Sequence, residues 1–143
     1  MRIKVEPLSA EAFAPYGQVF ALPPPGSRTN ITPFLENLRE HAGVKLHISC
    51  RAPTSLPFIG RTMERHPYSS QAFIPLNVSR YLVAVAPHAT NGGPELSKVQ
   101  AFCARGDQGV NYRANVWHAP MVVLDRDGQF AVLMWQDGTA TDE

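Results

Sequence analysis

The chain has 143 residues, a formal net charge of +1 and 17% charged residues. This length is typical of one domain, so we expect residues 1–143 to fold as a single unit. The near-neutral charge provides no attraction to nucleic acid or anionic membranes, and no apolar run approaches the ~20 residues of a membrane helix. We therefore expect a cytoplasmic protein that binds neither nucleic acid nor membrane.

Proline and cysteine usage narrow the class of protein further. The 13 prolines exclude a helix bundle, because a proline inside a helix breaks it. The two cysteines, Cys50 and Cys103, lie far apart in apolar surroundings and are too few for a disulfide framework in so short a chain. They predict buried thiols in a reducing compartment.

The first 43 residues contain few regular signals. Apolar and charged residues alternate around Ile3–Val5, which predicts a short strand. Ser9 is typical of a helix N-cap and predicts a brief helix that ends at Gly17. Residues 27–43 are mostly polar and have no clear period, so we expect irregular structure there, with a helical turn near Leu35–Glu40.

From residue 44 onward the pattern is repeatedly that of β-strands, because apolar and polar residues alternate in 44–51 and residues 81–86 form a continuous apolar run, as a strand buried on both faces would. Asp127-Gly128 favours a hairpin turn. Many short strands separated by glycine and proline predict an all-β fold, a sandwich or small barrel with one or two short helices. The predicted strands are 44–51, 58–65, 71–76, 81–86, 99–104, 109–112, 121–124 and 130–135.

Two stretches contain side chains that could do chemistry. In the first, Glu64, His66 and Gln71 surround a turn at His66–Tyr68. Residues two apart on a strand share a face, so the carboxylate of Glu64 and the imidazole of His66 can point into one cavity. The alternative is a solvent-facing glutamate and an ordinary turn histidine beside a proline.

The second stretch is centred on His118. A strand over Val110–Tyr112 meets a turn at Ala114-Asn115, and Trp117-His118 opens the next strand. Neutral imidazole serves as a metal ligand or as a base near pH 7. The alternative is a hydrogen-bonded histidine beside a core tryptophan.

Together the two stretches resemble the cupin superfamily, with Glu64, His66, Gln71 and His118 at the four positions of the cupin motifs. Glu64 replaces a histidine and Gln71 replaces a carboxylate of the usual set. Within that superfamily, nearly the whole chain resembles the ureidoglycolate lyase family. The runs that carry this resemblance are Val5–Leu8, Glu64–Pro67, Gln71–Pro75, Gln108–Tyr112, Asn115–His118 and Phe130–Trp135.

The resemblance implies a cupin-like β-sandwich or small barrel of jelly-roll type. It also implies cleavage of (S)-ureidoglycolate to glyoxylate and urea in allantoin degradation. The implied catalytic residues are His118 or His66 as the base, with Glu64 orienting a histidine or binding metal. Glu64, His66 and His118 could together hold a divalent metal ion (Ni, Mn or Zn), which would bind the carboxylate and hydroxyl of the substrate.

Five further residues are candidates for binding the substrate. Arginine suits a planar carboxylate; Arg51 is the first candidate and Arg113 the second. The amides of Gln71 and Asn111 could bind the urea end by hydrogen bonds. Tyr112 could act as an acid or as an orienting group, although strand tyrosines are more often core residues.

The family resemblance also implies a homodimer. Two alternative functions remain at this point. An amidohydrolase acting on the same substrate would release ammonia instead of urea. A cupin that has lost catalysis would only bind a small molecule, and the replacements at Glu64 and Gln71 motivate this alternative.

Overall fold

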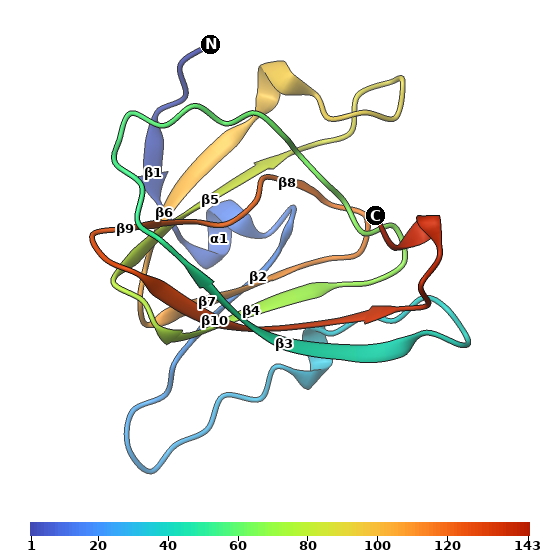
Figure 1. The fold of residues 1–143 in the computed structure, drawn as a ribbon, viewed down its shortest axis with the longest axis horizontal. Coiled ribbons are helices and arrows are strands. Elements are labelled where there is room, and N and C mark those ends of the chain that lie inside the picture. The colour runs from blue at the N-terminus through green and yellow to red at the C-terminus, as the bar shows by residue number, and fades with distance from the viewer.

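The computed structural model describes residues 1–143, and its backbone pairs into two five-stranded β-sheets that face each other (Figure 1). In the first sheet the strand order is β1-β6-β5-β8, with β9 also paired to β5. Its strands are β1 (Val5–Pro7), β5 (Arg80–Ala86), β6 (Gln100–Arg105), β8 (Trp117–His118) and β9 (Val122–Leu124).

The second sheet has the strand order β2-β7-β4-β10-β3. All its neighbouring strands are antiparallel, whereas β1 and β6 of the first sheet are parallel. Its strands are β2 (Gly17–Ala21), β3 (Gly43–Arg51), β4 (Gln71–Asn77), β7 (Gln108–Tyr112) and β10 (Gly128–Gln136). Helical structure is limited to α1 (Ala10–Phe13) and the 3-10 turns Thr32–Phe34, Leu96–Lys98 and Ala140–Asp142.

The core lies between the inner faces of the two sheets. On β5, Tyr81 and Val83 are fully buried, and on β10, Phe130 and Val132 are buried against them. Alternation along each strand places these side chains inside, as the period of a β-strand requires. The prediction of an all-β sandwich with short helices is confirmed.

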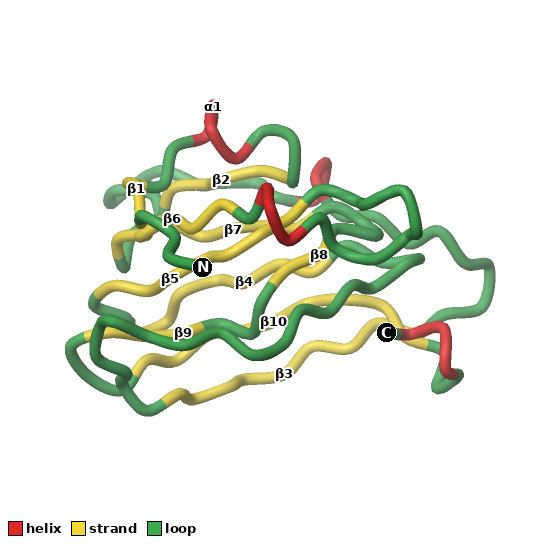
Figure 2. The backbone as a smooth tube through the Cα atoms, turned by 90° about the horizontal axis from the view of Figure 1, so that it is seen from above, coloured by secondary structure: helices red, strands yellow, loops and turns green.

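The short helix α1 closes one edge of the sandwich, beside β1 and β2 (Figure 2). The Ser9 hydroxyl caps it by accepting a hydrogen bond from the Ala12 N–H, as predicted. Phe13 is fully buried and packs against Phe102 of β6 and Tyr112 of β7, so the helix joins the two sheets. The helix has four residues, and no helix in the structure is long and apolar enough to cross a membrane.

Two local predictions are wrong because long-range pairing overrides local pattern. Residues 58–65 form no strand; of them, Glu64 alone makes a β-bridge, to His118. The helical turn expected near Leu35–Glu40 is absent, and this segment instead lies along the loop before β4, where Asn37 bridges Ser69.

The predictions of a hairpin at Asp127-Gly128 and of two buried thiols are also wrong. The Asp127-Gly128 turn does not connect paired strands, because β9 pairs with β5 while β10 pairs with β3 and β4. The turn therefore carries the chain from one sheet to the other. Cys50 is exposed and Cys103 is only half-buried, so they are not the buried thiols expected, although both are free.

Gly17 marks the closest approach between β2 and the strand β7. A Cβ atom at Gly17 would lie 1.8 Å from the backbone oxygen of Asn111, a clash that no side-chain rotation relieves. We expect Gly17→Ala to lower the free energy of unfolding by about 2 kcal/mol, measured by urea denaturation. The matched control is Gly43→Ala on β3, where the nearest atom is 3.9 Å away and no loss is expected; equal losses would contradict this account.

Candidate active site

A single β-bridge brings the two chemically interesting stretches together. The N–H of Glu64 donates to the carbonyl of His118 at 2.8 Å, and the N–H of His118 donates to the carbonyl of Glu64 at 2.9 Å. Side chains directly opposite each other in an antiparallel pair project to the same face. The bridge therefore places the carboxylate of Glu64 beside the imidazole of His118.

The predicted turn at Ala114-Asn115 makes a second contact between the two stretches, at His66, two residues after Glu64. Asn115 has a φ of 69°, a left-handed conformation that asparagine tolerates better than most residues. Its N–H donates to the carbonyl of His66 at 2.8 Å, and its side-chain oxygen accepts from Arg65. The segments around Glu64–His66 and Asn115–His118 are thus joined at both ends.

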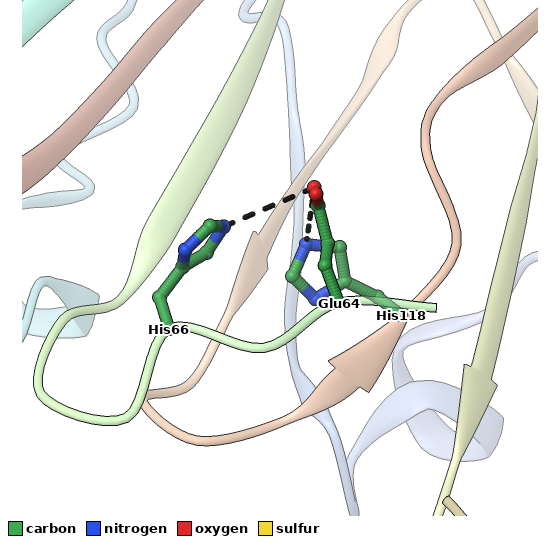
Figure 3. Close-up of side chains that lie close together, drawn as sticks. All are labelled: Glu64, His66 and His118. Atoms are coloured by element: carbon green, nitrogen blue, oxygen red, sulfur yellow. Dashed lines mark ion pairs between the residues drawn. The ribbon is translucent and has the colours of Figure 1, made fainter. Parts of the chain in front are cut away.

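The side chains of Glu64, His66 and His118 form a triad (Figure 3). The Nε2 atom of His118 lies 3.5 Å from Glu64 Oε1, and that of His66 lies 4.0 Å from the same oxygen. Potential ligand atoms of all three residues lie within 4.8 Å of one another. The two histidines are buried, and the glutamate side chain remains 30% exposed. The predicted catalytic and metal-binding residues are therefore brought together.

Backbone carbonyls determine which ring nitrogens face the carboxylate. The Nδ1–H of His118 donates to the carbonyl of Val116 at 2.9 Å, and the Nδ1–H of His66 donates to the carbonyl of Asp142 at 2.9 Å. A carbonyl only accepts, so each Nδ1 carries the hydrogen. Both Nε2 atoms point toward Glu64, and that of His118 is buried without a hydrogen-bond partner.

The carboxylate of Glu64 gives the centre of the triad a negative charge. The interaction with His118 lowers the pKa of the Glu64 carboxyl, against the opposing effect of burial, and the nearby His66 lowers it further. Glu64 is therefore ionised at neutral pH. Burial, with the charge of Glu64 as a second cause, raises the pKa of the Tyr112 hydroxyl, so this phenol stays protonated.

Two of the predicted substrate-binding residues lie against the triad. The ring of Tyr112 stacks on that of His118 at 4.2 Å and 15°, and its hydroxyl is buried with no hydrogen-bond partner. Gln71 lies with its amide oxygen 3.2 Å from His66 Nε2. An amide has both an acceptor and a donor, so Gln71 can pair with that nitrogen whether or not it carries a hydrogen.

The other three predicted substrate-binding residues do not lie at the triad. Arg51 ends β3 opposite Gly128, at the far end of β10 from Trp135, the residue that contacts the site loop through Ser69. Asn111 donates to Gln18 and to the carbonyl of Phe34 instead. Arg113 is exposed and donates to the carbonyl of Ala14.

Sequence reasoning missed the residues that surround the triad. The carbonyls of Val116 and Asp142 have no signal in a sequence, because every residue has a carbonyl group. Glu36 lies in the segment expected to be irregular, yet its carboxylate accepts from the N–H of Ala114 and its backbone pairs with Ser70. A partly buried glutamate in an unpatterned segment offered no recognisable motif.

The triad suits a divalent metal ion. Two imidazole nitrogens and a carboxylate oxygen are common ligands of zinc and related metals. Ligating histidines usually donate the other ring N–H to a carbonyl or carboxylate, as both do here. The buried, unpartnered Nε2 of His118 faces a carboxylate, and two acceptors 3.5 Å apart are suited to a cation between them.

Comparisons with known proteins show the family of this chain. The sequence model of a family described as "Ureidoglycolate lyase" matches residues 1–143. The chain is 39% identical to a ureidoglycolate lyase from Brucella ovis over 140 residues, which cover 92% of this chain and 81% of that protein. It is 36% identical to one from Rhizobium etli over 92% of this chain and 82% of the relative. A third, from Schizosaccharomyces pombe, is 45% identical over 57% of this chain and 44% of its own length.

A solved structure, RmlC from Streptococcus suis in complex with dTDP-D-xylose, aligns over 68% of this chain and 46% of its own. The TM-score is 0.46 and the sequence identity 8%.

The fold and site define a two-sheet β-sandwich protein with a buried histidine–glutamate centre. The chain belongs to the ureidoglycolate lyase family, whose sequence pattern it matches from end to end.

Proposed function

We propose that this protein cleaves (S)-ureidoglycolate to glyoxylate and urea, as a carbon–nitrogen lyase of allantoin degradation. The observation that carries the proposal is the triad, in which two histidine Nε2 atoms converge on one ionised carboxylate in a member of this family. Two free cysteines are consistent with work in the reducing cytoplasm.

The reaction requires two proton transfers. The substrate carbon bears a hydroxyl, a carboxylate and a urea nitrogen. A base takes the hydroxyl proton, the carbon–oxygen double bond forms, the carbon–nitrogen bond breaks, and the urea nitrogen takes a proton. His118 suits the base, because its Nδ1 holds a hydrogen for Val116 and leaves the Nε2 lone pair free.

The proton donor to the departing nitrogen lies on the other side of Glu64. Glu64 stabilises a protonated imidazole at either neighbouring Nε2, since it is ionised and 3.5–4.0 Å from both. When protonated, His66 can give the proton on its Nε2 to the departing nitrogen while His118 keeps the proton taken from the hydroxyl, so the two transfers balance. Gln71 supports the Nε2 of His66 in either state. Tyr112 offers a protonated hydroxyl that is free to donate a hydrogen bond to the substrate.

A divalent metal ion (Ni, Mn or Zn), held by Glu64, His66 and His118, is the alternative arrangement within this proposal, because an Nε2 lone pair that binds a metal does not also take a proton. When bound, such an ion lowers the pKa of a coordinated hydroxyl and provides positive charge for the carboxylate of the substrate. This role matters because the arginines first expected to bind that carboxylate, Arg51 and Arg113, lie elsewhere.

The proposal is tested by product analysis on racemic ureidoglycolate, with and without a chelator. We expect protein-dependent glyoxylate with an equal amount of urea and no ammonia, above the spontaneous decay of the substrate. A rate that falls with the chelator and recovers with an added divalent metal would assign the Nε2 atoms of the triad to the metal, and an unchanged rate would assign them to proton transfer. Ammonia in place of urea would indicate an amidohydrolase, and no acceleration with any metal would leave a binding protein.

Variants of the triad separate catalysis from folding. We expect His118→Ala, His66→Ala and Glu64→Gln each to lower kcat by about 10²–10⁴-fold, as measured in the glyoxylate assay. The control is His41→Ala, whose side chain is 89% exposed and lies outside the triad, and which should keep full activity. Turnover that survives all three triad changes would contradict the assignment of the site. Lost turnover with ligand-induced stabilisation also absent would show that the variants are misfolded.

We further propose that the protein is a homodimer and that a second copy covers the outer face of β3. Val44, Leu46 and Ile48 are 63–69% exposed on this strand, although they are apolar. β3 also pairs only with β10, so its other edge is open. An apolar, open edge strand is a surface on which another copy can pair.

The dimer is tested by sedimentation equilibrium. We expect the native chain to sediment as a dimer and Leu46→Lys/Ile48→Lys to sediment as a monomer, because two buried charges oppose the contact. Leu96→Lys, at a comparably exposed leucine in a 3-10 turn, is the control and should remain dimeric. A monomeric native chain at micromolar concentration would exclude this surface as a dimer contact.

A further inference from the structure

Arg39 holds the end of the chain against the strand β10. Its Nη1 atom lies 2.7 Å from Asp142 Oδ1 and 3.1 Å from Asp137 Oδ1, and its Nη2 donates to the carbonyl of Trp135 at 3.0 Å. The Arg39 side chain is only 13% exposed and that of Asp142 14%, so these contacts are shielded from solvent. An arginine with three such contacts fixes the position of this turn.

Asp142 uses both its side chain and its backbone. Its carboxylate accepts from the N–H groups of Asp137 and Gly138 at 3.0 and 2.9 Å, which closes the turn. Its carbonyl accepts from Nδ1–H of His66 at 2.9 Å. The same residue that Arg39 holds therefore provides the acceptor that orients a histidine of the triad.

We propose that Arg39 and Asp142 form a positioning clamp that keeps His66 in the tautomer with hydrogen on Nδ1 and Nε2 toward Glu64. Neither residue touches the triad carboxylate, so both act through His66. Without the clamp, the carbonyl of Asp142 is free to move away from Nδ1, and the amide oxygen of Gln71, 3.2 Å from Nε2, is then the acceptor that favours the other proton position. The effect on turnover rests on the proposed function, whereas the effect on the tautomer does not.

His118 provides a comparison for His66 within the same site. His118 has the same kind of hydrogen bond, but its acceptor is the carbonyl of Val116, two residues away on the same segment. Arg39 contacts neither His118 nor Val116. Loss of the clamp should therefore change the tautomer of His66 and leave that of His118 unchanged, which a general loosening of the fold would not do.

The test is ¹⁵N NMR of the histidine rings in the whole protein without added metal, at a pH where they are neutral. The His66 signals are assigned by their absence from His66→Gln. In the native protein we expect a protonated-type signal at Nδ1 and a lone-pair-type signal at Nε2 for both triad histidines. In Arg39→Met we expect the two His66 signals to move toward the average of the tautomers, and kcat to fall by about 10–100-fold.

Asp142→Asn is a second, isosteric variant that keeps the carbonyl and removes the charge bound by Arg39. We expect it to shift the His66 signals in the same direction by a smaller amount. The matched control is Arg80→Met, which removes an arginine bound to Asp125 at 2.7 Å on an exposed surface and should change neither histidine.

Unchanged His66 signals in both clamp variants would overturn the proposal, as would equal shifts of His66 and His118. If the native protein fails to cleave ureidoglycolate, the proposed function is wrong, but the NMR result still decides whether the clamp exists.

Discussion

The pair of backbone hydrogen bonds between Glu64 and His118 is the interaction on which the rest of the site depends. These residues are 54 positions apart, in a loop without regular structure and a strand of two residues. The bridge provides two hydrogen bonds to backbone groups that would otherwise be unpaired near the core, where unpaired groups are costly. Its geometry also determines that a carboxylate and an imidazole share one face.

Around this bridge, two backbone carbonyl groups determine which ring nitrogen of each histidine carries the hydrogen. The carbonyls of Val116 and Asp142 each take the Nδ1–H of one histidine, so both Nε2 atoms face the same carboxylate. The ring of Tyr112 stacks on that of His118 and provides an apolar surface beside the imidazole. Buried imidazoles with one defined donor are suited to proton transfer and to metal binding.

The strands were predictable where the sequence has clear runs of apolar residues. The expected strands at residues 71–76, 81–86 and 130–135 correspond to β4, β5 and β10 with small shifts at their ends, because one face of each strand is buried in the core. Residues 58–65 were also predicted to form a strand but lie outside both sheets, and only Glu64 makes an isolated bridge, to His118. The Asp127-Gly128 turn has hairpin chemistry, yet the strands on its two sides pair with different partners. Pairing between distant strands decided both cases, and no local pattern reports it.

By itself, the sequence determined the all-β class, the family and three residues of the site, Glu64, His66 and His118, since alternation and motif spacing are local properties. Only the tertiary structure decided what these residues face. It placed Tyr112 and Gln71 against the histidines and directed Asn111, one residue before Tyr112 on the same strand, to the opposite side. It also brought Arg39 and Asp142 to His66. Such contacts follow from how the two sheets and the chain ends meet in space, and a linear pattern contains no record of that meeting.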